Sequence, residues 1–352
     1  MAYPPSCDPF AAWYNAPPYP GEPMLTLNRR HALALTVASL ATSPALALGP
    51  RPAPLNPPVK MTLALNIVPH VCPMVSIVEE LKPLGVEVET AKFARYADTR
   101  TALASGSVDM GSIGPADISI ALSQGLKTIV SLMGVGIADK NPIARKGVSL
   151  AKWEDLVGPK IGIAPGSAVW FQFAAMMTEV GVPYNKLSTI NIQGAGTSFL
   201  QAMQRGDIDV FIGWEPFESQ AVLDGMATRQ TALDYSRSKA VGAELGLLAV
   251  NADYLKKQPE AVKRFLWAYL AIQERLNASK PALAQAISAY TGLPAEVALS
   301  VANVTTLGQF LTLDQMQRQA ATFFKLGVLT KDVSGDLGPY FNQDLVASVT
   351  KS

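Results

Sequence analysis

A repeat at a spacing of one hundred residues constrains the fold of this chain more than any other feature. Upstream, Lys60 and Ala64 recur as Lys160 and Ala164. Further along, small and acidic residues recur in the same order: Ala102, Gly106, Asp109, Ala121 and Gly125 return as Ala202, Gly206, Asp209, Ala221 and Gly225. Each copy has the pattern of strands alternating with helices, which predicts two α/β lobes rather than a short solenoid repeat. Two such lobes leave a cleft between them, where small ligands bind outside the carboxyl ends of strands.

Length and charge narrow the function classes. The 352 residues are enough for two lobes that each bury a core. The net charge is +1 and only 16% of the residues are charged, without a basic stripe, so we expect neither nucleic acid nor an anionic membrane as a partner. The two cysteines are Cys7, which falls in the leader, and Cys72, which is then left without a partner for an internal disulfide.

The N-terminal segment has the features of an export signal. Arg29 and Arg30 precede an apolar stretch at residues 32–41, and Ala45-Leu46-Ala47 forms a cleavage site of the A-x-A type. We expect cleavage after Ala47 and release of a free protein to the periplasm, by the general secretory (Sec) route or by the twin-arginine route. Residues 1–23, before Met24, are either a misassigned start or a disordered leader.

The pattern along the chain predicts the domain boundaries. We expect a leader and export signal at residues 1–47, a proline-rich linker at 48–59, lobe I at 60–137 plus 243–352, and lobe II at 148–235. From Pro259 onward the apolar spacing is helical throughout, and Thr312 followed by Gln315 is typical of a helix cap.

Two turns after predicted strands offer candidate binding groups. Gly166-Ser167 opens a helix, where backbone N–H groups and the helix dipole favour a ligand oxygen, although Ser167 is equally suited to capping that helix. Trp170, one turn on, either covers the cleft or belongs to the core. Trp214-Glu215 follows another strand, and offers a flat ring and an acceptor for an N–H group, or else an edge tryptophan beside a solvated glutamate.

His70 is the only histidine beyond the leader, and it also follows a predicted strand. It can donate to a ligand oxygen or titrate near neutral pH. His70 and Cys72 alone are too few for a tetrahedral metal site, so we expect no metal. No G-x-S-x-G, P-loop or complete dinucleotide motif is present, so we expect no cofactor, no catalytic residues and no enzymatic activity.

Four stretches of the sequence carry a family resemblance: ALASGSVDMGSIG, DLVGPKIGIAPGS, QAMQRGDIDVFIGWEPF and QPEAVKRFL. Together they resemble the solute-binding proteins of ABC importers in the nitrate/sulfonate/taurine (SsuA/THI5-like) group. The resemblance implies a two-lobed, type II periplasmic-binding-protein fold of the α/β class, with two crossover segments and a helical C-terminal region. It also implies a pocket made by the loops after strands, here Pro69-His70, Gly114-Pro115, Gly166-Ser167 and Trp214-Glu215.

The resemblance leaves the activity open between a binding protein and an enzyme. The first hypothesis is a monomeric periplasmic component that delivers a small solute to an ABC permease and its ATPase at the inner membrane. The alternative is an enzyme on the same fold, related to pyrimidine (thiamine precursor) synthases, but the cysteine-rich motif of those relatives is absent and only His70 or Cys72 could react. A sensing domain is a third possibility, disfavoured because no further domain follows Ser352.

The candidate residues also predict a class of ligand. No arginine stands at the predicted strand ends, and a bare inorganic anion would demand a guanidinium. We therefore expect a small polar organic solute, heteroaromatic, amine-bearing or sulfonate-like. A heteroaromatic or amine-bearing solute would stack on Trp214 and donate a hydrogen bond to Glu215.

Overall fold

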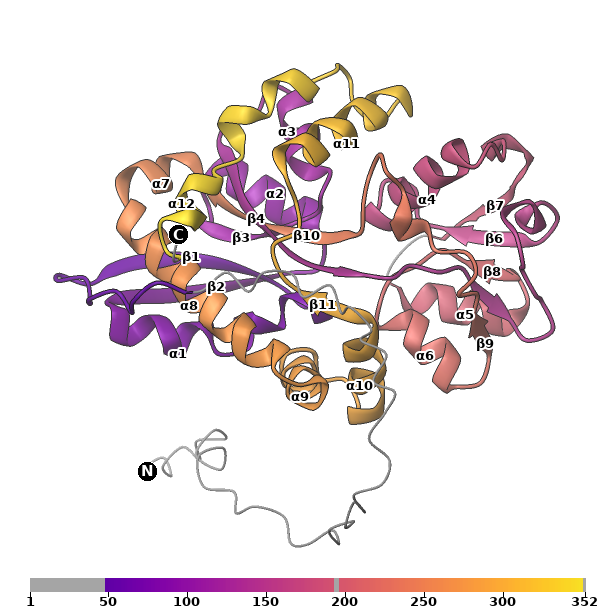
Figure 1. Ribbon diagram of the computed structural model, residues 1–352, viewed down its shortest axis with the longest axis horizontal. Coiled ribbons are helices and arrows are strands. Elements are labelled where there is room, and N and C mark those ends of the chain that lie inside the picture. The colour runs from indigo at the N-terminus through magenta and orange to yellow at the C-terminus, as the bar shows by residue number, and fades with distance from the viewer. Residues whose placement is uncertain (1–47, 193–195, 351–352) are drawn as a thin grey trace, which may run out of the picture. The chain divides into compact units, whose positions relative to one another are not determined.

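The structure, a computed structural model, describes residues 48–192 and 196–350 (Figure 1). The predicted leader and export signal lie outside these residues. The described strands form two sheets that lie side by side, and two segments of chain run between them (Figure 1). We call the six-stranded sheet with its helices the first lobe, and the five-stranded sheet with its helices the second lobe.

The six-stranded sheet has the order β11-β4-β10-β3-β1-β2. Its strands are β1 (Val59–Asn66), β2 (Val86–Phe93), β3 (Met110–Ile113), β4 (Ile129–Ala138), β10 (Glu244–Asn251) and β11 (Thr305–Leu307). β1 runs parallel to β2 and β3, whereas β10 is antiparallel to β3 and β4. Apolar side chains alternate along β10, so that Leu248 and Val250 join the core on one face and Leu247 and Ala249 that on the other.

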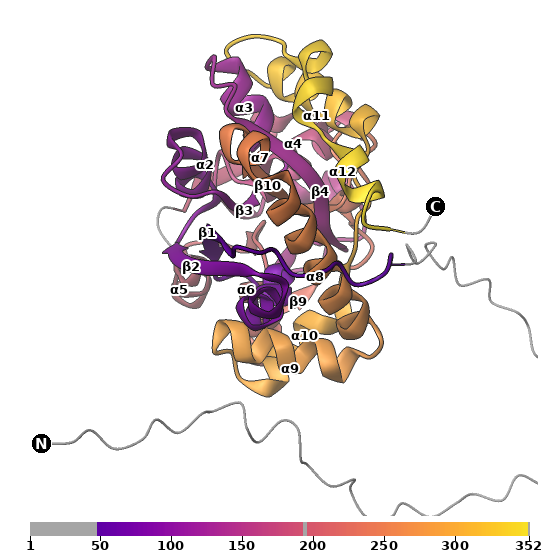
Figure 2. The ribbon, with the colours of Figure 1, turned by 90° about the vertical axis from the view of Figure 1, so that its left-hand side faces the viewer.

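Helices cover both faces of this sheet, above and below it in Figure 2. One face carries α1 (Ile77–Leu81) and α8 (Pro259–Asn277). The other carries α2 (Tyr96–Ser105), α3 (Asp117–Ser123) and α11 (Leu313–Lys325). The remaining helices of the lobe are α7 (Ala252–Lys257), α9 (Lys280–Thr291), α10 (Ala295–Val304) and α12 (Gln343–Ala347). None of the helices in the described part of the chain is both long and apolar enough to cross a membrane.

The five-stranded sheet has the order β7-β6-β8-β5-β9. Its strands are β5 (Ile143–Arg145), β6 (Lys160–Ile163), β7 (Ser188–Asn191), β8 (Val210–Phe211) and β9 (Ala227–Arg229). The core on one face includes α4 (Ala168–Glu179), and the core on the other includes α5 (Thr197–Arg205) and α6 (Phe217–Leu223).

The hundred-residue repeat has a structural counterpart in these two sheets. The order β2-β1-β3-β10-β4 in the first sheet matches β7-β6-β8-β5-β9 in the second. In both sheets an aspartate of the repeat accepts a hydrogen bond from the backbone of a strand. Asp109 Oδ2 accepts from Thr62 N of β1 at 2.7 Å, and Asp209 Oδ2 accepts from Lys160 N of β6 at 3.0 Å. α2 and α5 both end at a left-handed glycine, Gly106 (φ 74°) and Gly206 (φ 75°), where a side chain would be strained.

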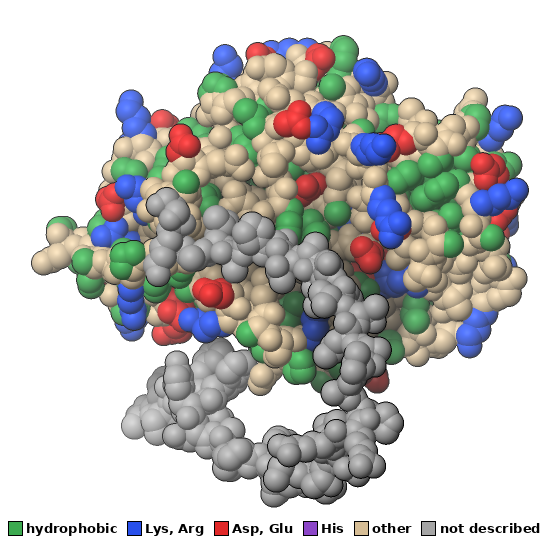
Figure 3. Space-filling model, viewed as in Figure 1, with side chains coloured by type: hydrophobic (Ala, Val, Ile, Leu, Met, Phe, Trp, Pro, Cys, Tyr) green, Lys and Arg blue, Asp and Glu red, His purple; other side chains and the backbone are tan. Residues whose placement is uncertain are grey.

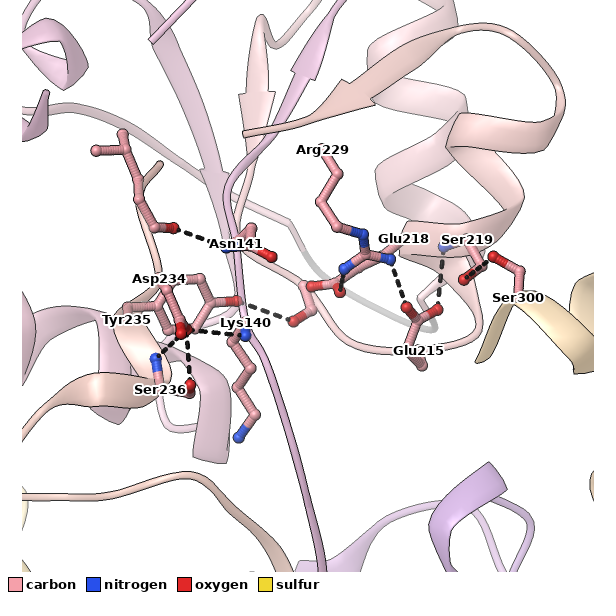
Figure 4. Close-up of polar contacts among 12 residues, drawn as sticks. Lys140, Asn141, Glu215, Glu218, Ser219, Arg229, Asp234, Tyr235, Ser236 and Ser300 are labelled. Atoms are coloured by element: carbon pink, nitrogen blue, oxygen red, sulfur yellow. Dashed lines mark hydrogen bonds and ion pairs between the residues drawn. The ribbon is translucent and has the colours of Figure 1, made fainter. Parts of the chain in front are cut away.

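Each sheet receives one interior antiparallel strand, β10 or β5, from across the molecule, through two crossover segments, residues 139–142 and 230–243. These segments are hydrogen-bonded to one another. Lys140 N donates to Asp234 Oδ1 at 3.2 Å, Tyr235 N donates to Lys140 O at 2.9 Å, and Asn141 Nδ2 donates to Leu233 O at 3.2 Å. The crossovers therefore form one paired strip between the lobes (Figure 4).

Several local expectations differ from the structure. Between β1 and α1 the chain forms a 3-10 helix (Pro69–Val75) containing Pro73, which lacks the N–H that an α-helix needs, and α1 begins only at Ile77. The prediction that the chain is helical throughout after Pro259 was wrong at β11, which pairs with β4. The cap at Thr312 is confirmed, since its Oγ1 accepts from Gln315 N at 3.2 Å.

The segment expected to be a linker is bonded to the first lobe. Gly49 N donates to Val349 O at 2.9 Å, Trp267 Nε1 donates to Gly49 O at 2.9 Å, and Arg264 donates to Ala53 O. The division of the chain into leader, linker and two lobes at the boundaries given above stays a prediction.

Candidate functional site

A small cavity lies between the lobes, beside the first crossover. Its wall consists of Pro69, His70, Ala138, Asp139, Lys140, Val169, Gly213, Trp214, Glu215, Glu218, Leu245 and Thr305. These residues follow the carboxyl ends of β1, β4 and β8, or lie on α4, α6, β10 and β11. The space that water can reach is about 30 Å³, which is room for roughly one water molecule. The lobes are therefore closed on one another here.

His70 belongs to the 3-10 helix that follows β1, where Pro69 occupies the first position. Its Nε2 is hydrogen-bonded to Tyr96 OH at 2.5 Å. Burial, and then the charge of Lys140, lower the pKa of His70 to about 3. The ring is thus neutral at physiological pH and acts in the cavity as a polar, uncharged surface.

Lys140 brings a buried ammonium group from the first crossover to the cavity wall. Its Nζ donates to Gln172 Oε1 of α4 and to Glu244 O at 3.3 Å. Burial lowers the pKa of Lys140 to about 7, against the opposing pull of Glu244, Glu218 and Asp234. Two of the three donors of this ammonium are therefore engaged by described residues.

Trp214 lies just after β8 and is half-buried. Its ring packs edge-on against Phe199, with centroids 5.6 Å apart, and against Phe217, with centroids 6.2 Å apart. These contacts fix the ring at the cavity wall, as an aromatic anchor requires.

Glu215 and Glu218 share one guanidinium, that of Arg229 on β9 (Figure 4). Arg229 Nη2 donates to Glu215 Oε1 at 2.6 Å, and Nη1 donates to Glu218 Oε2 at 2.9 Å. Glu215 Oε2 accepts from Ser219 N at 3.0 Å, so both oxygens of Glu215 are engaged. Glu218 Oε1 is buried and has no hydrogen-bond partner among the described residues. Burial, and then the proximity of Glu215, raise the pKa of Glu218 to about 8.

The structure brings together Pro69, His70, Trp214 and Glu215 of the expected pocket, but not Gly114 and Pro115. The latter two are buried beside α3 and do not line the cavity. Gly114 N donates to Asp117 Oδ2 at 2.7 Å, so the turn uses its N–H group internally.

Gly166, Ser167 and Trp170 also lie off the cavity wall. Gly166 is exposed, and Ser167 Oγ accepts from Trp170 N at 3.2 Å, which is the capping role. Trp170 Nε1 donates to Tyr184 OH at 2.7 Å, within the second lobe. Ligand contacts by any of these residues stay a prediction.

Sequence reasoning missed Lys140, Glu218 and Arg229. No arginine stands at the strand ends that the sequence predicted, but Arg229 ends β9, a short strand that the sequence pattern did not predict. Glu218 had a usable signal, since it stands one helical turn after Glu215. Lys140 directly precedes Asn141-Pro142, which marks the crossover, but its burial depends on tertiary contacts.

Cys72 is buried and reduced, and burial raises the pKa of its thiol to about 12. The described residues contain no group of three or more His, Cys, Asp or Glu side chains that could hold a metal ion.

Two lobes, two crossovers and a cleft between them define the periplasmic-binding-protein fold, and solved structures show the same architecture. The aliphatic sulphonate binding protein SsuA from Escherichia coli superposes with a TM-score of 0.69 and 18% identity, over 82% of this chain and 99% of that one. The nitrate-binding protein NrtA from Synechocystis PCC 6803 gives a TM-score of 0.68 and 17% identity, over 85% of this chain and 89% of that one.

Residues 82–274 match the NMT1/THI5-like family, and the chain belongs to that family. A curated relative is the taurine-binding periplasmic protein of Escherichia coli (strain K12), which is 28% identical over 194 residues. The match covers 55% of this chain and 58% of the relative, so the chain spans little more than half of that protein's length.

Proposed function

We propose that this protein is the exported solute-binding component of an ABC importer, which captures a small polar organic solute between its lobes and delivers it to a membrane permease and ATPase. The composition of the cavity wall carries the proposal. His70 comes from the first lobe, Trp214 and Glu218 come from the second, and Lys140 comes from a crossover. A solute held there contacts every part that moves when two lobes close on a ligand.

Export agrees with the relatives, among which are proteins named as periplasmic. The chain is bonded to the first lobe from its first described residues onward, since Leu48 pairs with Thr350 and Gly49 N donates to Val349 O at 2.9 Å.

The groups around the cavity support a polar solute rather than an apolar one. Lys140 places an amino group and Glu218 a carboxyl group on one wall, and Trp214 adds a ring face. On the face shown in Figure 3, basic and acidic side chains are interspersed among the described residues. Because the closed cavity holds about 30 Å³, a whole solute enters only when the lobes part.

The enzymatic alternative is not supported by its two candidate reactive groups. A nucleophilic cysteine needs a lowered pKa and an exposed position, whereas Cys72 is buried and its pKa is raised. His70, with its pKa lowered to about 3, is a weak proton acceptor.

A thermal-shift screen tests the proposal. The purified protein is melted with taurine, alkylsulfonates, nitrate, pyrimidines and aromatic acids at increasing concentration. Binding to the folded state alone raises the melting temperature with the logarithm of ligand concentration, so at least one of these classes should give such a rise. A melting temperature that stays constant for every class up to millimolar concentrations would contradict the proposed function.

A further inference from the structure

We propose that Glu218 is the specificity residue of the site, which selects solutes carrying a cationic nitrogen and gives up its carboxyl proton when such a solute binds. This inference rests on the proposed function, because it concerns the same cavity. It assigns to Glu218 the acceptor role that the sequence suggested for Glu215, whose two oxygens are occupied.

The position of the Glu218 carboxyl group is the first support. Oε2 is held by Arg229 at 2.9 Å, which fixes the plane of the group. Oε1 is buried without a partner among the described residues, and Glu218 lines the cavity. Buried acceptors without partners are few in folded proteins and costly, so each one calls for an explanation. The cavity of about 30 Å³ matches the size of an ammonium head group.

The charges that face Glu218 are the second support. They come from its own turn, from β9, from both crossovers and from the first lobe: Glu215, Arg229, Lys140, Asp234, Tyr235 and His70. Arg229 is shared between two carboxyl groups, and Glu215 also holds a backbone N–H, so a second buried negative charge is poorly compensated. Lys140 is the remaining cation, and its own pKa is lowered to about 7. His70 is neutral.

The protonation change follows from these charges. The pKa of Glu218 is raised to about 8, so the carboxyl is mostly protonated at pH 7. An ammonium group that donates an N–H bond to Oε1 brings the positive charge that the carboxylate lacks, and this favours the ionised form. The Glu218 O–H bond breaks, its proton passes to the buffer, and no other covalent bond changes. Affinity for a cationic solute should therefore rise about tenfold per pH unit below the pKa of about 8.

Isothermal titration calorimetry at pH 7 in two buffers of different ionisation enthalpy tests the inference. The probes are taurine, methylammonium and ethanesulfonate, which resembles taurine without the nitrogen. The proteins are wild type, Glu218→Gln, and Glu154→Gln as a matched change at an exposed site of the second lobe. We expect taurine to release about one proton per site from wild type and from Glu154→Gln. Glu218→Gln should release none, and its preference for taurine over ethanesulfonate should be at least tenfold smaller than that of wild type.

Failure of this inference is distinguishable from failure of the proposed function. Proton release that is absent in wild type, or a preference for taurine over ethanesulfonate that Glu218→Gln retains, overturns the inference while solute binding stands. Ethanesulfonate binding without taurine or methylammonium binding also overturns it. If none of the probes binds and no ligand class raises the melting temperature, the proposed function is contradicted as well. Should Glu218→Gln fail to fold, the rise of wild-type taurine affinity between pH 6 and 8 decides, and a flat profile contradicts the inference.

Discussion

His70 and Glu218 face the same cavity, and their folded-state pKa values are displaced in ways that give opposite dependences of stability on pH. For Glu218 the folded pKa of about 8 exceeds the ordinary value of 4.5. Its contribution to the free energy of unfolding is therefore full below pH 4.5 and is lost as the pH rises to 8. For His70 the folded pKa of about 3 lies below the ordinary 6.5, so its contribution is full above pH 6.5 and is lost as the pH falls toward 3.

We predict that His70→Gln reduces the acid sensitivity of the protein. Between pH 6.5 and pH 4 the unfolded wild type takes up a proton on His70 that the folded form refuses, which lowers the free energy of unfolding. The variant lacks this imidazole, so its free energy of unfolding should fall less over that range, as measured by urea denaturation. If the free energy of unfolding fell equally steeply with pH in the two proteins, His70 would be taking up its proton in the folded state as well.

At the residue scale the sequence could predict part of the cavity wall. Pro69, His70, Trp214 and Glu215 were found because they directly follow strands, and the carboxyl ends of strands converge at a cleft. The burial of Lys140 could not be predicted, since it depends on the side chains of α4 and the second crossover that surround it.

At the scale of elements, two helix contacts join the lobes on either side of the crossovers (Figure 1). On one side α4 meets α11, where Phe171 packs on Phe323 with centroids 4.7 Å apart and both rings are buried. On the other side α6 meets α10, where Ser300 donates to Ser219 Oγ at 3.0 Å. Separating the first contact would expose two large apolar side chains, which costs more than separating a hydroxyl pair. We therefore expect the Ser219–Ser300 contact, between α6 and α10, to separate more readily than the Phe171–Phe323 contact.

We predict that a disulfide between these helices locks the site. With Ser219→Cys and Ser300→Cys combined, oxidation should hold the lobes closed, so that solutes no longer shift the melting temperature and a reductant restores the shift. Each single variant, treated with the same oxidant, serves as the control and should keep the full response. A solute response that persists in the oxidised double variant would mean that entry does not require these helices to separate.

Elements with strong periodicity could be predicted, whereas short ones could not. The helix that begins after Ser167 follows from its cap and apolar spacing, and the structure has it as α4. β9 and β11 have three residues each, and such strands exist because neighbouring strands supply their hydrogen bonds. Because the sequence pattern did not predict β9, it also did not predict that Arg229 lies near the site.

At the scale of the whole molecule, the repeat predicted two related lobes because each copy carries its own strands, helix ends and glycine turns. The lobe boundaries expected from the sequence placed residues 243–352, and with them β10, in lobe I. The sequence did not predict β5, so the exchange of β5 and β10 between the lobes was only half anticipated, because strand pairing is a long-range property. This exchange accounts for both crossovers, and the crossovers place Lys140 between the lobes.

The central claim is that the lobes close around a solute, and small-angle X-ray scattering tests it most directly. The solute that gives the strongest thermal shift is added to the purified protein at saturation. We expect a smaller radius of gyration with the solute than without it, because the cleft opens in the free protein and closes when the solute is held. The change should be absent in the oxidised Ser219→Cys/Ser300→Cys variant. An identical radius in both states of the wild type, at a solute concentration that saturates the thermal shift, would contradict the account.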